Sequence, residues 1–138
     1  MADLANIKSN IKEEVVVTLK LGKDDILNEP KGDAEATPMT ITLSGPNSKA
    51  SQEVAFDIQD EAIAKYKADP KSQEISSRKM FELRVDRAAR NTTGWNITLD
   101  GKSPKFTLDA VKAFYNEYKM FFYQVEEALE IESGFTLA

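Results

Sequence analysis

Residues 105–135 have the sequence KFTLDAVKAFYNEYKMFFYQVEEALEIESGF, and this stretch holds most of the chain's aromatic side chains. Apolar residues recur in it at intervals of three and four, which is the spacing of one face of an α-helix. Thr107 is a suitable N-cap, and Gly134 suits the position just after a helix ends. The pattern predicts one long amphipathic helix over residues 107–133, with a row of core residues made of Val111, Phe114, Tyr118, Phe122, Val125 and Leu129.

Two residues of this helix, Met120 and Tyr123, fall outside the apolar arc. Counted at about 100° per residue, they lie about 180° and 120° around the helix from Val111. Exposed aromatic and methionine side chains are the types that protein interfaces favour. We expect both residues to contact a partner, together with Phe135 and Leu137 in the tail. The alternative is that they belong to the core.

The N-terminal half of the chain predicts a small antiparallel sheet. Residues 14–21 and 39–44 alternate between apolar and polar side chains, which is the period of a half-buried strand. A long loop rich in glycine, proline and aspartate joins them, so we expect them to pair without a tight turn. Residues 1–12 are polar, and we expect them to be loosely ordered.

Two further helices are expected in the middle of the chain. The first begins at Asn47 or Ser48 and ends near Asp69, because Pro70 disfavours a helical residue before it. Its predicted core row is Ala50, Val54, Ile58, Ala62 and Tyr66. The second begins near Ser76, and its candidate core residues are Met80, Phe81, Leu83, Val85, Ala88 and Ala89.

Residues 95–106 resemble a short hairpin with Asp100 and Gly101 as a two-residue turn, although Pro104 limits the second arm. Trp95, the only tryptophan, is expected to pack in the core or against this hairpin. Together these patterns predict one mostly helical α+β domain over residues 1–138. It has about four helices and a small antiparallel sheet formed from the N-terminal half.

The composition argues against most enzymes. The 138 residues include no cysteine and no histidine, which removes thiol chemistry and the commonest general base and metal ligand. We therefore expect no catalytic residues, no metal and no cofactor. The net charge of −5 opposes general binding to nucleic acid or to an anionic membrane. No apolar run approaches the roughly 18 residues of a membrane span, so we expect a cytoplasmic protein.

Basic residues nevertheless gather over residues 74–90, which contain Arg78, Lys79, Arg84, Arg87 and Arg90. Clustered guanidinium groups bind phosphates, so a nucleic-acid interface is one interpretation. The acidic residues Glu82 and Asp86 are interleaved with them, which is typical of a solvated helix face. The acidic balance of the whole chain favours the solvated face.

Several modest motifs follow one another in a characteristic order. The segment ITLSGPNS (41–48) leads from a strand into a polar helix, and ARNTTGWNITLDGKSPKFT (89–107) introduces the aromatic helix. Over roughly residues 26–135 this order resembles the tail assembly chaperones of long-tailed, siphovirus-like bacteriophages. The positions that match the family's pattern are Gly45, Ser48, Trp95, Ile97, Asp100, Gly101, Lys102, Phe106 and Thr107.

The resemblance implies a protein that binds the phage tape measure protein, keeps its apolar helical segments soluble and helps tail tube subunits assemble. Such a chaperone acts in the cytoplasm of the infected host and is absent from the finished virion. The tail tube protein and a second copy of the chain are further candidate partners. Two alternatives remain. One is a structural tail component, such as a tube or completion subunit. The other is a regulatory nucleic-acid-binding protein that uses Arg78, Arg84, Arg87 and Arg90.

Overall fold

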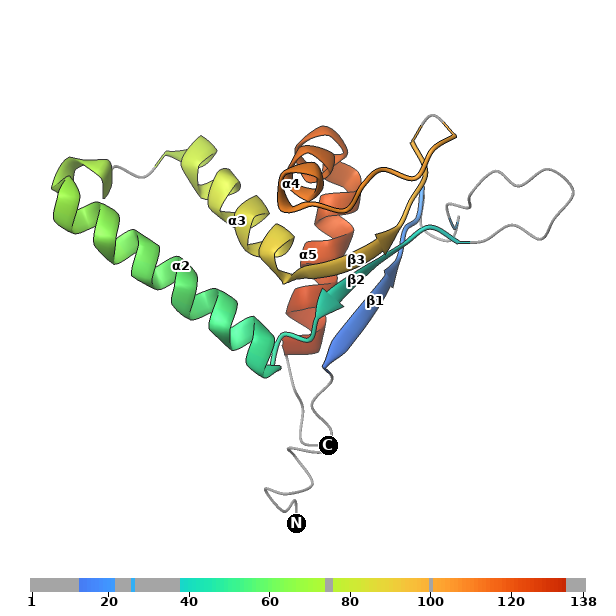
Figure 1. Cartoon of the computed structure of the whole chain (residues 1–138), viewed down its shortest axis with the longest axis horizontal. Coiled ribbons are helices and arrows are strands. Elements are labelled where there is room, and N and C mark those ends of the chain that lie inside the picture. The colour runs from blue at the N-terminus through green and yellow to red at the C-terminus, as the bar shows by residue number, and fades with distance from the viewer. Residues whose placement is uncertain (1–12, 22–25, 27–37, 74–75, 100, 134–138) are drawn as a thin grey trace, which may run out of the picture.

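The computed structural model describes residues 13–21, 26, 38–73, 76–99 and 101–133 (Figure 1). Its strands are β1 (Glu14–Thr18), β2 (Thr40–Ser44) and β3 (Thr92–Asn96). Its α-helices are α2 (Lys49–Ala68), α3 (Ser77–Asn91), α4 (Leu108–Glu117) and α5 (Lys119–Ser133), and a short 3₁₀ helix, η1, covers Pro70–Gln73. The described residues therefore confirm the predicted fold class, a mostly helical α+β fold with a small antiparallel sheet.

The sheet has the order β1-β2-β3, and both pairs of neighbours are antiparallel. Val17 pairs with Ile41, which pairs with Trp95 on its other side. The predicted pairing of the first two strands is confirmed. The third strand corrects the prediction, because it comes from the C-terminal half of the chain. Its first residues, Thr92 and Thr93, are β-branched and suit a strand.

The core lies between the sheet and three of the helices. Figure 1 shows α3, α4 and α5 gathered on one side of the sheet, while α2 stands apart at the edge of the molecule. Apolar residues of alternating strand positions and of these three helices fill the core: Val17, Leu19, Met39, Ile41, Leu43, Val85, Ala88, Ala89, Ile97, Val111, Phe114, Tyr115, Phe121, Phe122, Val125 and Leu129.

The predicted long C-terminal helix is wrong, because the chain forms two helices there. Tyr118 separates α4 from α5 and has φ −110° and ψ 68°, outside the helical range. Its N–H donates to the Phe114 carbonyl (2.8 Å), and its carbonyl accepts from the Phe121 amide (3.0 Å). No proline or glycine lies near the break. Packing explains it, since the buried rings of Phe114 and Phe121 stack across the break at 6.0 Å.

Tyr118 itself is not the core residue that the spacing predicts. It is 36% exposed, because at the break it no longer continues the buried face of either helix. Its ring lies against that of Phe114, with 5.2 Å between the centroids. The other predicted core residues of this region are buried, and Tyr115 and Phe121 are buried with them: Val111, Phe114, Phe122, Val125 and Leu129.

The predicted hairpin over residues 95–106 is confirmed at its turn, but its arms do not pair beyond Leu99 and Lys102. Leu99 and Lys102 exchange backbone hydrogen bonds of 2.8 and 3.0 Å, and Gly101 has φ +76°, which favours glycine. The start of the first arm, Trp95 and Asn96, belongs to β3 and pairs with β2 instead. The second arm forms no strand, since Pro104 lacks the N–H that a ladder needs.

Trp95 lies half-buried at the edge of the core. Its Nε1 donates to the Pro104 carbonyl (3.2 Å), and its ring meets Phe106 and Phe114 edge to face at 5.4 and 5.8 Å. The indole thus holds the connection between β3 and α4 against the core. This is the packing role expected from the sequence, although the indole ring is only partly buried.

The limits of α2 match the prediction, but its predicted core row is wrong. Ser48 caps the helix, since its Oγ accepts from the Ser51 amide (3.2 Å) and donates to the Gly45 carbonyl (2.5 Å). Among the residues of α2, only Ser51 is buried. A row with a spacing of four turns about 40° at each step. From Ala50 to Tyr66 it therefore turns about 160° and cannot stay on one face.

A side-chain link joins the end of the first strand to α5. The Gln124 amide accepts a hydrogen bond from the backbone N–H of Lys20 (2.9 Å) and donates one to its carbonyl (2.7 Å). Both bonds connect parts of the chain that lie 104 residues apart in the sequence.

Candidate partner-binding surface

The two predicted contact residues of α5 are exposed. Met120 is 47% and Tyr123 51% accessible. The break at Tyr118 does not alter their exposure, because both residues lie on the side of α5 opposite its buried residues. Those buried residues are Phe121, Phe122, Val125 and Leu129. Phe135 and Leu137 lie outside the described residues, so their predicted role stays a prediction.

Beside this pair, α5 meets α3 along a seam that consists of Phe81, Arg84, Lys119, Phe122 and Glu126. The rings of Phe81 and Phe122 meet edge to face at 5.4 Å. The Arg84 guanidinium lies 5.8 and 5.7 Å from their centroids, and the Lys119 Nζ lies 5.5 Å from that of Phe81. Long cationic side chains therefore cover the rings of the seam and keep its outer surface charged.

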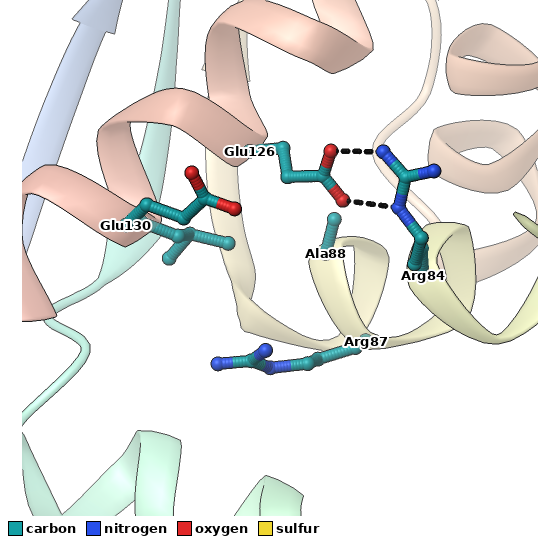
Figure 2. Close-up of a pocket in the computed structure, with 6 residues that line it drawn as sticks. Arg84, Arg87, Ala88, Glu126 and Glu130 are labelled. Atoms are coloured by element: carbon teal, nitrogen blue, oxygen red, sulfur yellow. Dashed lines mark hydrogen bonds and ion pairs between the residues drawn. The ribbon is translucent and has the colours of Figure 1, made fainter.

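Glu126 fixes Arg84 in this position. The Arg84 Nε donates to Oε2 of Glu126 (2.7 Å) and Nη2 donates to Oε1, which makes the pair bidentate (Figure 2). The hydrogen bonds to Glu126 raise the pKa of Arg84. Arg87 and Glu130 line the other end of a hollow of about 130 Å³ beside the pair (Figure 2). This is well below the roughly 300–1,000 Å³ of typical small-molecule sites.

Two residues predicted for the core of α3 are exposed instead. Met80 is 53% and Leu83 51% accessible, whereas Val85, Ala88 and Ala89 are buried. At about 100° per residue, Met80 and Leu83 lie roughly 140° and 160° around the helix from Val85. They are therefore on the opposite face of α3, where they add to the apolar surface that a partner can contact.

A third set of exposed apolar residues, the outer row of α2, consists of Phe56, Ile63 and Tyr66. They are 58%, 53% and 52% accessible. Val54 and Ile58, which lie about 160° from Phe56 in either direction, are partly buried and face the rest of the chain. Sequence reasoning missed this row, although the spacing of seven residues between Phe56 and Ile63 is a signal for it.

Ion pairs join α2, α3 and α4 at one point. Arg90 of α3 donates to both carboxylate oxygens of Glu61 on α2 (2.5 and 3.0 Å) and to Asp86 (3.0 Å). Lys112 of α4 lies 2.8 Å from the same Asp86 oxygen. Partial burial alone would raise the pKa of Asp86, but hydrogen bonds from Lys112 and Arg90 outweigh it and hold that pKa below 3.8. The hydrogen bond from Arg90 likewise lowers the pKa of Glu61.

An open groove of about 350 Å³ lies where α2, α3 and the start of α4 meet. Phe106 and Leu108 are both exposed at its edge. The groove has room for an apolar side chain of a partner, and its lining residues are Val54, Asp57, Ala89, Arg90, Thr92, Phe106, Leu108 and Val111.

The basic residues of α3 do not form a continuous cationic face. Arg84 is paired with Glu126, and Arg90 is paired with Glu61 and Asp86. These pairings favour the solvated helix face over the nucleic-acid interface, since carboxylates compete with phosphates for the same guanidinium groups.

In the part of the chain that the structure describes, no group of three or more histidine, cysteine, aspartate or glutamate residues could hold a metal ion. No helix within the described ranges is long and apolar enough to cross a membrane.

Comparison with known proteins gives no match: no protein-family model fits the chain, and neither a curated protein nor a solved structure is significantly similar to it. A functional assignment therefore depends on the ordered motifs of the sequence and on the geometry of the exposed surface. Within the described residues, three parts of that surface lie on single helices or helix pairs: the Met120–Tyr123 pair with the adjoining seam, the outer face of α3 and the outer row of α2.

Proposed function

We propose that this chain is a tail assembly chaperone of a long-tailed bacteriophage and binds the tape measure protein through protein–protein contacts. The observation that carries the proposal is the exposure of Met120 and Tyr123 beside the charged seam. The motifs from Gly45 to Thr107, which resemble this chaperone family, supply the identity of the client. In this proposal the chain acts in the cytoplasm of the infected host and leaves the tail before it is complete.

The chemistry of the surface suits an apolar helical client. A methionine side chain is flexible and polarizable, so it adapts to apolar partners of different shape. Tyr123 adds a rigid ring with a polar end, a combination that interfaces favour. Arg84, Lys119 and Glu126 keep the surroundings hydrated when no client is bound, which limits self-aggregation through the apolar residues.

Weak contacts at such a surface become effective on a long client. A tape measure protein offers many helical segments along one chain, so several chaperone copies bind it at once. Each copy covers apolar residues of the client that would otherwise associate with one another. The tail tube protein can then replace the chaperone without breaking any single strong contact.

Co-expression with the tape measure protein tests the proposal. We expect the chain to raise the soluble fraction of the client and to co-purify with it. The double variant Met120→Ala/Tyr123→Ala should lose most of the co-purification while keeping the unfolding midpoint of the wild type, because both side chains are exposed. Glu117→Ala, an exposed polar change on the neighbouring α4, is the matched control and should bind like the wild type.

Two results would contradict the proposed function, and a third would contradict the proposed site. One is an unchanged client solubility with no complex. The other is the chain itself in purified virions by mass spectrometry, which would identify a structural tail component instead. A fall in the unfolding midpoint of the double variant equal to its loss of binding would place Met120 and Tyr123 in the core.

A further inference from the structure

The outer row of α2 faces away from every other described element. The opposite face of the helix carries Ser51, which is buried, and Glu61, which pairs with Arg90 of α3. At about 100° per residue these two lie roughly 140° from Phe56 in opposite directions. Figure 1 shows α2 at the edge of the molecule, with the rest of the chain on one side of it. Phe56, Ile63 and Tyr66 therefore have no apolar contact surface within the described chain that covers them.

The spacing of the outer row is that of a helix that packs against another helix. Phe56 and Ile63 are seven residues apart, as are Gln59 and Tyr66, and the four alternate at intervals of three, four and three. Such a repeat forms the seam of a two-helix coiled coil, and a polar side chain within the seam, here that of Gln59, lowers its stability. The row runs through the middle of a helix of 20 residues, about 30 Å long.

We propose that two copies of this chain associate through α2, with the two helices antiparallel about a two-fold axis that passes near Asp60. Charge complementarity along one flank of the outer row identifies the second copy as the occupant. Glu53 lies seven residues before Asp60, and Lys67 lies seven residues after it. The three residues lie about 60°, 40° and 20° around the helix from Phe56, so they share one flank.

An antiparallel pair brings opposite charges on this flank to the same height. Glu53 and Lys67 each lie about 10.5 Å from Asp60 along the axis, in opposite directions. The two-fold axis therefore places Glu53 of one copy beside Lys67 of the other, and it does so twice. In a parallel in-register pair each of these residues would instead face its own counterpart.

The same axis interleaves the apolar side chains. Phe56 lies four residues before Asp60, while Ile63 and Tyr66 lie three and six residues after it. In the antiparallel pair Phe56 of one copy therefore falls between Ile63 and Tyr66 of the other. The rest of each chain lies on the side of its own α2 away from the outer row, so the bodies of the two copies are directed away from each other. The result is a closed, self-complementary interface of the commonest kind.

One contact in this arrangement is unfavourable. Asp60 lies next to the two-fold axis and faces Asp60 of the second copy across it. Like charges at short range repel, so this residue weakens the association that the rest of the interface favours. The arrangement therefore predicts that removing the charge of Asp60 strengthens dimerisation.

A charge-reversal series measured by sedimentation equilibrium tests the arrangement with the full chain. Glu53→Lys and Lys67→Glu should each weaken dimerisation by at least about threefold, and the effect should shrink in high salt. The double variant Glu53→Lys/Lys67→Glu should return to within about twofold of the wild type, because each reversed pair is again complementary. The two residues lie about 21 Å apart within one helix, so this rescue cannot arise inside a single copy.

Two further variants complete the series. Phe56→Ala should weaken the dimer by about tenfold or more, because an aromatic residue at the centre of the interface is lost. Asp60→Asn should tighten it by about twofold or more. All these residues are exposed, so the unfolding midpoints of dilute monomers should stay unchanged.

The proposal is overturned if the wild type remains monomeric at every concentration that the centrifuge can measure. It is also overturned if the double reversal is no better than the single ones, or if Asp60→Asn weakens the dimer. These outcomes do not depend on the tape measure protein, since client binding is assigned to α5 and not to α2.

Discussion

The helix α2 and the pair α4–α5 have similar apolar spacing in the sequence, but the aromatic side chains of α4–α5 are mostly buried and those of α2 are exposed. Six of the ten residues from Phe114 to Tyr123 are aromatic, and four of those six rings are buried. Over 20 residues α2 has two aromatic side chains, and both are exposed. Spacing thus predicts that a helix forms, whereas the breadth and density of its apolar surface predict whether the domain folds around it.

The largest expected difference between the two regions is in how much one phenylalanine contributes to the free energy of unfolding. Phe122→Ala should lower the free energy of unfolding by about 3–5 kcal/mol, because it leaves a cavity beside Phe81 and Tyr115. Phe56→Ala on α2 should change it by less than about 0.5 kcal/mol. Chemical denaturation of both variants below the concentration of self-association measures the difference. Equal losses would mean that the outer row of α2 is part of the core.

The next effect concerns the ion pairs of Asp86, which join α3 to α4. Asp86→Asn should cost about 1–2 kcal/mol at pH 7, because Lys112 and Arg90 lose a charged acceptor. The folded-state pKa of Asp86 is lowered from 3.8, so its stabilisation is present above that pH and is lost as the pH falls through the folded-state pKa. Denaturation curves should therefore converge for the wild type and the variant at low pH. A difference that persists there would show that the charge is not its cause.

A smaller effect is expected at the start of α2. Ser48→Ala removes the N-cap acceptor of the Ser51 amide and the hydrogen bond to the Gly45 carbonyl, at a cost of about 1 kcal/mol. Ser48→Asp retains a capping oxygen and serves as the matched control, which should recover part of the loss. Thermal unfolding followed by circular dichroism measures both. If Ser48→Ala unfolds at the same temperature as the wild type, this cap does not stabilise the start of α2.

The smallest effect is local. Glu61→Gln should leave global unfolding unchanged but should speed hydrogen exchange of the amides in the second half of α2, because the contact with Arg90 is weakened. Glu117→Gln, an exposed change on α4 away from the Glu61–Arg90 contact, is the control. Exchange rates that change equally in α5 would point to global destabilisation and contradict the local account.

Local chemistry explains the parts of the fold that the sequence predicts. The cap at Ser48 and the proline after Asp69 act within a few residues, so the limits of α2 follow from them directly. The alternation of β1 and β2 and the buried faces of α4 and α5 are likewise properties of short windows. These features could be predicted because no distant contact is needed to produce them.

Contacts between distant residues account for the rest. The break at Tyr118 has no proline or glycine signal and follows from the packing of Phe114 on Phe121. The third strand forms because β2 offers it an edge. For the candidate surface, helical angles predicted the exposure of Met120 and Tyr123. The pairing of Arg84 with Glu126 spans 42 residues and could not be predicted from either segment alone.

The bond between Gln124 and Lys20 has a consequence for the edge of the sheet. An exposed strand edge presents unpaired N–H and C=O groups on which another chain can add a strand. The Gln124 amide offers the same donor and acceptor as a peptide group, and it occupies both backbone groups of Lys20 just beyond β1. A side chain of α5 thus binds the peptide groups of Lys20, which also forms an isolated bridge with Ile26, and this part of the edge is closed to sheet growth between molecules. The proposed task of this protein is to keep another chain from aggregating, and these two hydrogen bonds limit aggregation through its own sheet.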